Sequence, residues 1–374
     1  QGKSALLYDK LKDKLANHIG TVLYQSVLKE VEKSPLNAID IAYQQHCDQT
    51  LVVRSIFLYL DRTFVLTGSF NDGANGSRRS LWDVAQSDFR ELILLRDDAA
   101  ILNKVCSALL NAVADDRKGA DMDRALARRT MRMLSALSLY VSHFEPNLLS
   151  SSLQHFETTA MIEASELALA AYTLRVEQHL NEESRRVDTY IDERTRSALI
   201  AQCEKVYLQW KDRLDRLCTD STRGLGQLTL TNAMNDLARC VRLVSRRGVN
   251  LLSELRTAWC SWAEKHAASL VDDQTRDKTL IVELLSFCDV LTQAEKTAFN
   301  NSALGADTRQ ALGRALNRRS NRVAQLAARQ SDALLRTGAK RTLEEIEAGL
   351  DKLVALFRLL SAKDVFAAFY AKFL

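Results

Sequence analysis

Residues 341–360 read RTLEEIEAGLDKLVALFRLL, and the spacing of their apolar side chains is typical of an α-helix. The apolar positions are Leu343, Ile346, Leu350, Leu353, Val354, Phe357 and Leu360. Because steps of three and four residues keep side chains on one face of a helix, the pattern predicts one buried stripe. Thr342 is followed three residues later by Glu345, a capping-box pattern that predicts the start of this helix.

The same periodicity recurs along most of the chain. One apolar stripe precedes Pro146 and consists of Leu126, Met133, Leu134, Leu137, Val141 and Phe144. Another lies within residues 161–190 and consists of Leu169, Tyr172, Val176, Leu180 and Val187. The 374 residues include only two prolines and 13 glycines, so helices can continue for long stretches without interruption. No stretch alternates apolar and polar residues convincingly, and the sequence therefore predicts an all-α fold.

Polar interruptions divide the chain into blocks. They are TGSFNDGANGSRR at 67–79, DDRKGADMD at 115–123 and TDSTRGLGQ at 219–227. The first is rich in glycine and asparagine and predicts a surface loop. We therefore expect blocks of some 100 to 150 residues, each holding several helices, that form helical bundles stacked end to end.

The bulk composition narrows the choice of partners and compartment. The formal net charge is only +4, from 51 basic and 47 acidic residues, so charge does not favour nucleic acid or an anionic membrane as a partner. No apolar run approaches the roughly 20 residues that span a bilayer. The seven cysteines are scattered and never form a CxxC pair, which suits reduced thiols in the cytosol or nucleus.

Three charged residues interrupt the apolar stretch RSIFLYLDRTFVLT at 54–67, namely Arg54, Asp61 and Arg62. Asp61 has no basic residue three or four positions away, so its partner is expected on another helix or in solvent. Two faces of a helix over 51–66 are apolar; they comprise Val53, Phe57, Leu60 and Phe64 on one side and Val52, Ile56, Tyr59 and Thr63 on the other. Such a helix is expected between other helices. We interpret the three charges as structural.

Longer segments carry a resemblance to a known family. YQQHCDQTLVVRSIFLYLDRTFVLT at 43–67, followed by SLWDVAQSDFRELI at 80–93, resembles the first repeat of cullins, and in particular of the cullin-4 type. HLNEESRRVDTYIDERTRSALIAQCEK at 179–205 and LDKLVALFRLLSAKDVFAAFYAKFL at 350–374 resemble later cullin segments in the same order.

The resemblance implies a non-catalytic scaffold of a multi-subunit cullin-RING E3 ubiquitin ligase, found in cytoplasm and nucleus. It implies an elongated stalk of three cullin repeats, over residues 1–97, 98–220 and 221–374, which begins near the third helix of the first repeat. The implied partners are the propeller adaptor of the DNA damage-binding complex and its substrate receptors. A RING-box protein would bind only through a C-terminal domain that follows the stalk, and no direct nucleic-acid or membrane contact is implied.

The resemblance also implies that the helix matching Ser80–Ile93 docks the adaptor. The candidate contacts are Ser80, Leu81, Trp82, Val84, Ala85, Asp88 and Phe89. Ser80 is a suitable N-cap with Asp83 at the third helical position. Trp82 fits either an interface anchor or a core position, and it shares a stripe with Ala85 and Phe89. The flank formed by Leu81, Val84 and Asp88 is favoured as the face toward a partner.

We predict no catalytic, cofactor-binding or metal-ligating residue. His46 and Cys47 lack a second ligand pair at zinc spacing and are predicted to pack within a helix. An acid-free stretch over 308–331 contains Arg309, Arg314, Arg318, Arg319, Arg322 and Arg329. It favours a solvated helix over an acidic-partner or RNA contact, because no aromatic residues are interleaved for base stacking. The alternatives to the cullin reading are a helical-rod tethering or trafficking subunit and, less favoured, an RNA-binding helical protein.

Overall fold

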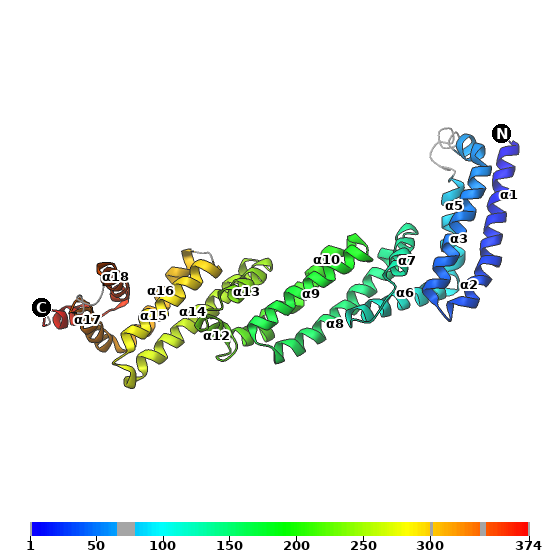
Figure 1. Ribbon diagram of the computed structural model, residues 1–374. Coiled ribbons are helices and arrows are strands. Elements are labelled where there is room, and N and C mark those ends of the chain that lie inside the picture. Colours follow the sequence, from blue (N-terminus) through cyan, green and yellow to red (C-terminus); the bar gives the residue numbers. More distant parts are fainter. Residues whose placement is uncertain (1, 66–78, 300–301, 337–341, 373–374) are drawn as a thin grey trace. The chain divides into compact units, whose positions relative to one another are not determined.

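The computed structural model describes residues 2–65, 79–299, 302–336 and 342–372. These residues form helices and turns, and none of them lies in a β-strand (Figure 1), which confirms the all-α prediction. They group into two compact units, a first unit of residues 1–155 and 181–202 and a second unit of residues 156–180 and 203–374. The division into three repeats remains a prediction. None of the described helices has the length and hydropathy needed to cross a membrane.

The helices of the first unit begin with a cluster around α5. In order they are α1 (Gly2–His18), η1 (Ile19–Leu23), α2 (Tyr24–Val31), α3 (Pro35–Ile56), η2 (Leu60–Val65), α5 (Leu81–Phe89), η3 (Arg90–Leu94), α6 (Arg96–Arg117), α7 (Arg124–Ala136) and η4 (Tyr140–Phe144). Both α1 and α3 contact α5, and α7 contacts α3. Pro35 occupies the first turn of α3, where its missing N–H removes no helical hydrogen bond.

Four further elements are α8 (Glu145–Glu166), α9 (Leu169–Thr189), η5 (Glu193–Thr195) and α10 (Arg196–Tyr207). The second unit continues with η6 (Trp210–Leu214), α11 (Asp215–Thr219), α12 (Leu225–Leu230), α13 (Met234–Arg246), α14 (Val249–Asp272), η7 (Gln274–Arg276), α15 (Leu280–Ala294), η8 (Glu295–Phe299), α16 (Ser302–Leu316), η9 (Asn317–Arg319), α17 (Ser320–Arg336), α18 (Leu343–Leu359) and α19 (Lys363–Tyr370). Within it α14 packs on α16 and α17 packs on α19.

The capping box predicted for α18 is present. The Glu345 amide donates to Thr342 Oγ1 at 3.2 Å, and the Thr342 amide donates to Glu345 Oε2 at 3.1 Å. The apolar stripe is narrower than predicted, because Leu343 is 72% exposed and Val354 is 47% exposed. The stripe predicted within residues 161–190 lies on α9 and is confirmed in full, since Leu169, Tyr172, Val176, Leu180 and Val187 are all buried.

Buried charges join α6, α7 and α9 in the first unit. Arg117 and Glu183 form an ion pair at 2.9 Å, with only 4% and 3% of their side chains exposed. The neighbouring carboxylate of Asp116 accepts hydrogen bonds from Arg124, Arg186 and Tyr190. Burial alone raises the pKa of Asp116, but the bonds from Arg124 and Arg186 outweigh burial and hold its pKa below the ordinary value. The carboxylate is therefore ionised and shared among three helices.

The arginines of residues 308–331 are mostly paired. Arg314 reaches Glu264 at 2.6 Å and Arg318 reaches Asp272 at 2.9 Å, both on α14. Arg319 and Arg322 share Asp277, at 3.2 and 2.7 Å. These acids lie outside the acid-free stretch in sequence, and they neutralise part of its charge. The arginines of the predicted solvated helix are thus largely engaged in ion pairs within the second unit.

Aromatic rings fill the second unit around α14. Trp259 lies 5.4 Å from Trp262 and 5.0 Å from Phe299, measured between ring centroids. The ring of Trp262 also packs edge-on against Phe287 at 5.7 Å. Gly226 of α12 lies directly against Trp262, since a Cβ atom at this position would be 2.1 Å from Trp262 Nε1. The indole is held by its neighbours and cannot move aside freely.

We therefore expect Gly226→Ala to lower the free energy of unfolding by about 1–3 kcal/mol, the usual cost of overpacking. Gly313→Ala is the matched control, because its Cβ would meet only the Leu359 carbonyl oxygen at an ordinary 3.7 Å. Alanine in the interior of α16 should leave stability unchanged or raise it. Urea unfolding of both variants measures the difference, and equal effects would contradict the close packing of α12 on Trp262.

Candidate functional site

Helix α5 is the element to which the sequence assigns partner binding, and its start is fixed by Ser80. Ser80 Oγ accepts a hydrogen bond from the Asp83 amide at 3.1 Å and donates to Asp83 Oδ2 at 2.7 Å. The predicted N-cap is thus confirmed. Just before it, the Arg79 carbonyl oxygen accepts a hydrogen bond from the Tyr8 hydroxyl of α1 at 2.7 Å.

Four of the seven candidate contact residues face inward. Leu81, Ala85 and Phe89 are fully buried, and Val84 is 2% exposed. Leu81 belongs to a small core with Tyr8 and Leu60. The preference for Leu81 and Val84 as the face toward a partner is therefore corrected. The reason is that α1 and α3 both pack on α5, so its inner face is wider than one stripe.

The remaining candidates, Ser80, Trp82 and Asp88, are partly exposed. Burial raises the pKa of Asp88, while the positive charges of Arg79 and Lys12 oppose the rise. An aromatic ring, a hydroxyl and a carboxyl group are thus available on the outer side of α5. Their contact with an adaptor stays a prediction.

Polar and aromatic residues of α3 hold α5 in place. His46 Nε2–H donates to the Ala85 carbonyl oxygen at 3.1 Å, and its ring lies 5.0 Å from that of Phe89. Tyr43 packs against Phe89 at 5.3 Å and donates from its hydroxyl to Gln86 Oε1 at 2.9 Å. The packing role predicted for His46 is therefore present. The role of Tyr43 was not found from sequence, since a Tyr at helical spacing carries no signal of its partner.

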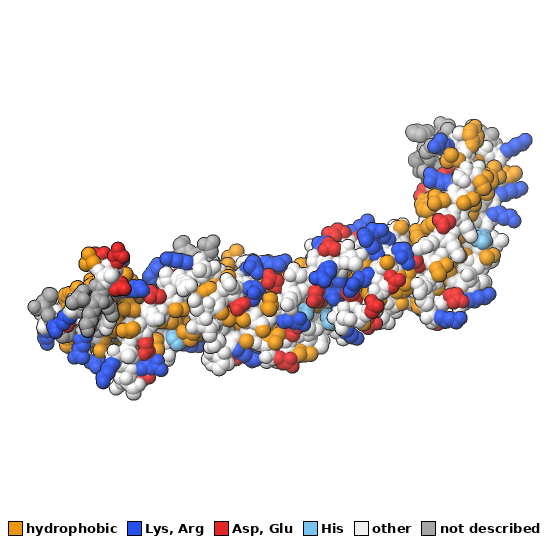
Figure 2. All heavy atoms as spheres, viewed as in Figure 1, with side chains coloured by type: hydrophobic (Ala, Val, Ile, Leu, Met, Phe, Trp, Pro, Cys, Tyr) orange, Lys and Arg blue, Asp and Glu red, His pale blue; other side chains and the backbone are white. Residues whose placement is uncertain are grey.

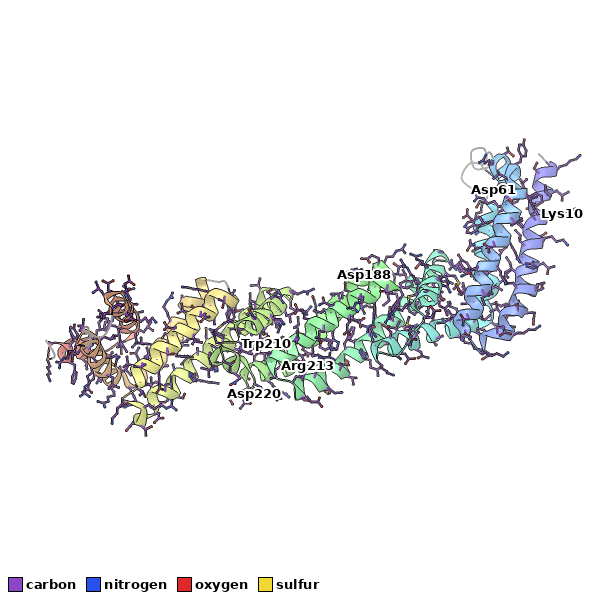
Figure 3. All side chains as sticks on the ribbon, viewed as in Figure 1. Lys10, Asp61, Asp188, Trp210, Arg213 and Asp220 are labelled. Carbon is purple, nitrogen blue, oxygen red and sulfur yellow. The ribbon has the colours of Figure 1, made fainter. Side chains whose placement is uncertain are left out.

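Asp61 links the end of α3 to the start of α5. Its Oδ2 pairs with Arg54 Nε at 3.1 Å, and its Oδ1 accepts a hydrogen bond from the Leu81 amide at 3.0 Å. The partner lies on another helical element, since Arg54 belongs to α3 and Asp61 to η2. The expectation that needs correction is that of one continuous helix over 51–66. Arg54 is seven residues earlier, and the chain leaves the regular helix at Phe57 (φ −99°, ψ 24°), which brings the two side chains together. Residues 35–65, which contain α3 and η2, are called the α3 helical run. Asp61 lies toward its end (Figure 3), and Arg62 beside it is exposed.

The outer face of this same run is open. Val52, Ile56 and Tyr59 are 58%, 69% and 80% exposed, so the prediction that both apolar faces of residues 51–66 are buried is wrong. Phe64 belonged to that prediction, but its side chain lies outside the described residues. Between α1 and α3 lies a groove of about 560 Å³, lined by apolar residues such as Leu11, Val52 and Phe57. An apolar surface of this kind is typical of a protein interface.

In the part of the chain that the structure describes, no group of three or more His, Cys, Asp or Glu side chains could hold a metal ion. The predicted loop at 67–79 falls almost wholly outside the described residues.

We expect Asp61→Ala to lower the free energy of unfolding by about 1–3 kcal/mol, because the Leu81 amide loses its acceptor in a buried place. Asp61→Asn keeps an acceptor oxygen and should cost less. Arg54→Ala should cost no more than about 1 kcal/mol, since 46% of the Arg54 side chain is exposed. Urea unfolding measures all three variants; an equal loss for Ala and Asn would show that the hydrogen bond to Leu81 is unimportant.

The lowered pKa of the buried His46 leads us to predict that stability depends on pH. Burial, opposed by the hydrogen bond to Ala85, lowers the pKa of His46 to about 4, whereas an unfolded histidine titrates near about 6.5. The unfolded state therefore binds a proton first as pH falls, so stability is lost between about pH 6.5 and 4, by up to about 3 kcal/mol. We expect His46→Gln to flatten this part of the profile. Profiles that run parallel for wild type and His46→Gln would contradict the assignment.

Comparison with known proteins identifies the family. The cullin family, described as the cullin alpha solenoid domain, matches residues 1–374. The chain is 31% identical over 373 residues to Cullin-4A from Homo sapiens, covering 99% of this chain and 47% of that protein. It is 27% identical over 369 residues to Cullin-4 from Dictyostelium discoideum, covering 97% of this chain and 44% of that protein. The chain thus spans about half the length of the curated relatives that it matches. The resemblance seen in residues 43–93 and in the later segments is confirmed, and the chain belongs to the cullin family.

Proposed function

We propose that this chain is the non-catalytic stalk of a cullin-RING E3 ubiquitin ligase of the cullin-4 type. The observation that carries the proposal is the cullin match over all 374 residues, together with the similarity to Cullin-4A. The relatives reported above are all cullins, so the tethering alternative is not pursued. A scaffold of this kind acts in the nucleus and the cytoplasm.

The mechanism of such a stalk is geometric. Even the longest helix described, α14 with 24 residues, extends only about 36 Å. Holding two partners farther apart requires helical bundles that pack on one another and act as a rigid spacer. The substrate receptor and the RING-box protein would be the two ends of that spacing, the latter bound through a C-terminal domain outside residues 1–374.

The adaptor would bind on the first unit. Its contact surface would combine the outer side of α5, with Trp82 and Asp88, and the apolar residues Val52, Ile56 and Tyr59 of the α3 helical run. A partly exposed Trp is a common energetic centre of an interface. The similarity to Cullin-4A supports the propeller adaptor of the DNA damage-binding complex as the partner, with its substrate receptors.

We expect the chain to bind the purified propeller adaptor in biolayer interferometry, and Trp82→Ala to weaken the Kd by at least about tenfold. Trp210→Ala is the matched control, since Trp210 is also a half-exposed Trp but belongs to the second unit. It should leave the Kd unchanged.

Melting temperatures separate binding from folding. A Trp82→Ala chain that loses stability but keeps its affinity for the adaptor would show that Trp82 is a core residue. It would contradict the proposal that the adaptor binds on α5. Failure of the wild-type chain to bind the adaptor at any soluble concentration would contradict the proposal that this adaptor is its partner.

A further inference from the structure

The outer face of α7 carries a row of arginines with unequal surroundings. Arg124, Arg128 and Arg132 follow one another at intervals of four residues, so they lie one above another along the helix. Arg124 bonds to Asp116 while 60% of its side chain stays exposed. Arg128 and Arg132 are exposed, and among the described residues neither has a recorded ion pair. Lys and Arg side chains gather visibly over α7 (Figure 2).

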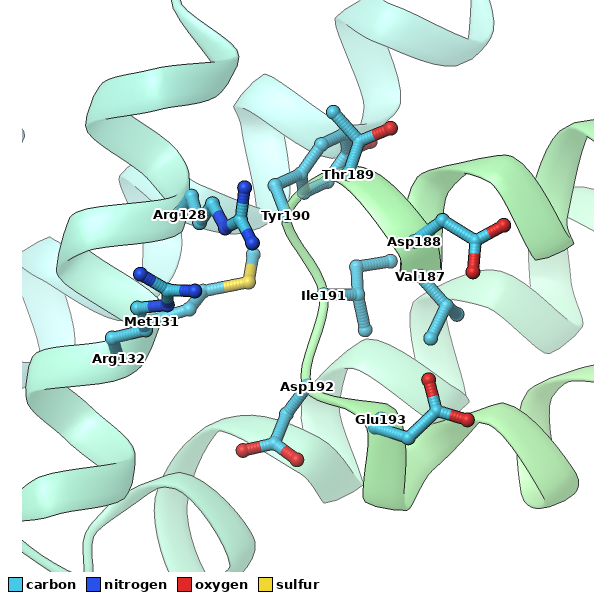
Figure 4. Close-up of a pocket in the computed structure, with 10 residues that line it drawn as sticks. All are labelled: Arg128, Met131, Arg132, Val187, Asp188, Thr189, Tyr190, Ile191, Asp192 and Glu193. Carbon is cyan, nitrogen blue, oxygen red and sulfur yellow. The ribbon is translucent and has the colours of Figure 1, made fainter.

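These arginines border two hollows that meet at Thr189 and Tyr190. Arg128 and Arg132 face a pocket of about 370 Å³ that is closed on its other side by residues 187–193 (Figure 4). Arg124 lines a second pocket of about 240 Å³, which also contains Thr189 and Tyr190. Both pockets lie within the first unit. The accessible lining of the larger one is more polar than apolar, since Met131, Val187 and Ile191 are buried.

The acids on the opposite wall are already engaged. Asp188 and Glu193 are both held by Arg196, the latter at 2.6 Å. Asp192 accepts hydrogen bonds from Ser135 Oγ at 2.6 Å and from the Arg194 amide at 3.1 Å. Asp188 lies at the end of α9 beside this wall (Figure 3). Because these acids have other partners, the N–H groups of Arg128 and Arg132 can donate hydrogen bonds to an incoming anion.

We propose that the arginine row of α7 and its two hollows bind an extended acidic segment of a partner protein. Guanidinium groups match carboxylates in geometry and charge. Four residues of helix rise by about 6 Å, and alternate residues of an extended chain are about 6.8 Å apart. A segment with acidic residues at every second position would thus place one carboxylate near each arginine.

The test uses the whole chain and a labelled peptide, Glu-Leu-Glu-Leu-Glu flanked by serines, followed by fluorescence anisotropy at about 0.1 M salt, where exposed charges are partly screened. We expect binding that the double variant Arg128→Ala/Arg132→Ala weakens by at least about tenfold, since it removes two charged contacts. The matched control is Arg247→Ala/Arg329→Ala, which removes the same charge from two exposed arginines of the second unit and should change the Kd less than about twofold.

Two further probes define the ligand. A peptide of the same composition with its three Glu residues adjacent should bind more weakly, because its spacing does not match the row. A single-stranded RNA oligomer should not compete. Absence of peptide binding, equal losses in the two double variants, equal affinity of the regrouped peptide, or tighter RNA binding that depends on Arg128 and Arg132 would each overturn the proposal. The four substituted arginines are exposed, so unchanged melting temperatures are expected for both double variants.

Discussion

Buried carboxylates that serve more than one helix are the interaction on which the first unit depends. Asp61 binds Arg54 with one oxygen and the first amide of α5 with the other. Asp116 binds groups from α7 and α9 while it sits at the end of α6. A helix terminus leaves amides and carbonyls without partners, and a carboxylate buried alone would be costly. Asp61 satisfies both needs at once, because its carboxylate binds both a cation and the first amide of α5. Asp116 satisfies the second, because its charge is balanced by arginines of two neighbouring helices.

The sequence predicted the local structure of this chain better than its contacts. Apolar periodicity identified the buried face of α9 in full, and cap residues located the starts of α5 and α18. Those features depend on residues within four positions of one another. The partner of Asp61 could not be found in the same way, because a break at Phe57 changes which residues of the run meet. Likewise, the burial of Leu81 and Val84 depends on α1, and no pattern within α5 reports that neighbour.

Apolar periodicity also could not predict which apolar helix faces are exposed. Val52, Ile56 and Tyr59 have the spacing of a core stripe, yet they are open in the described part of the chain. Spacing shows only that residues share a face. Whether another helix covers that face is decided by tertiary packing, and an uncovered apolar face is available to a partner. The sequence could thus propose which helices carry the candidate site, but not which of their sides are exposed.

Arginines show the same principle for charge. The acid-free stretch at 308–331 has the stronger basic pattern in sequence, but two acids of α14 and Asp277 pair with four of its six arginines. The shorter row on α7 looks weaker, yet two of its members keep their charge free beside a hollow. Coulomb energy depends on distance in space, so a local count of charges reports neither case. In a chain with a net charge of only +4, the pairing of each arginine decides which surface can attract an acidic partner.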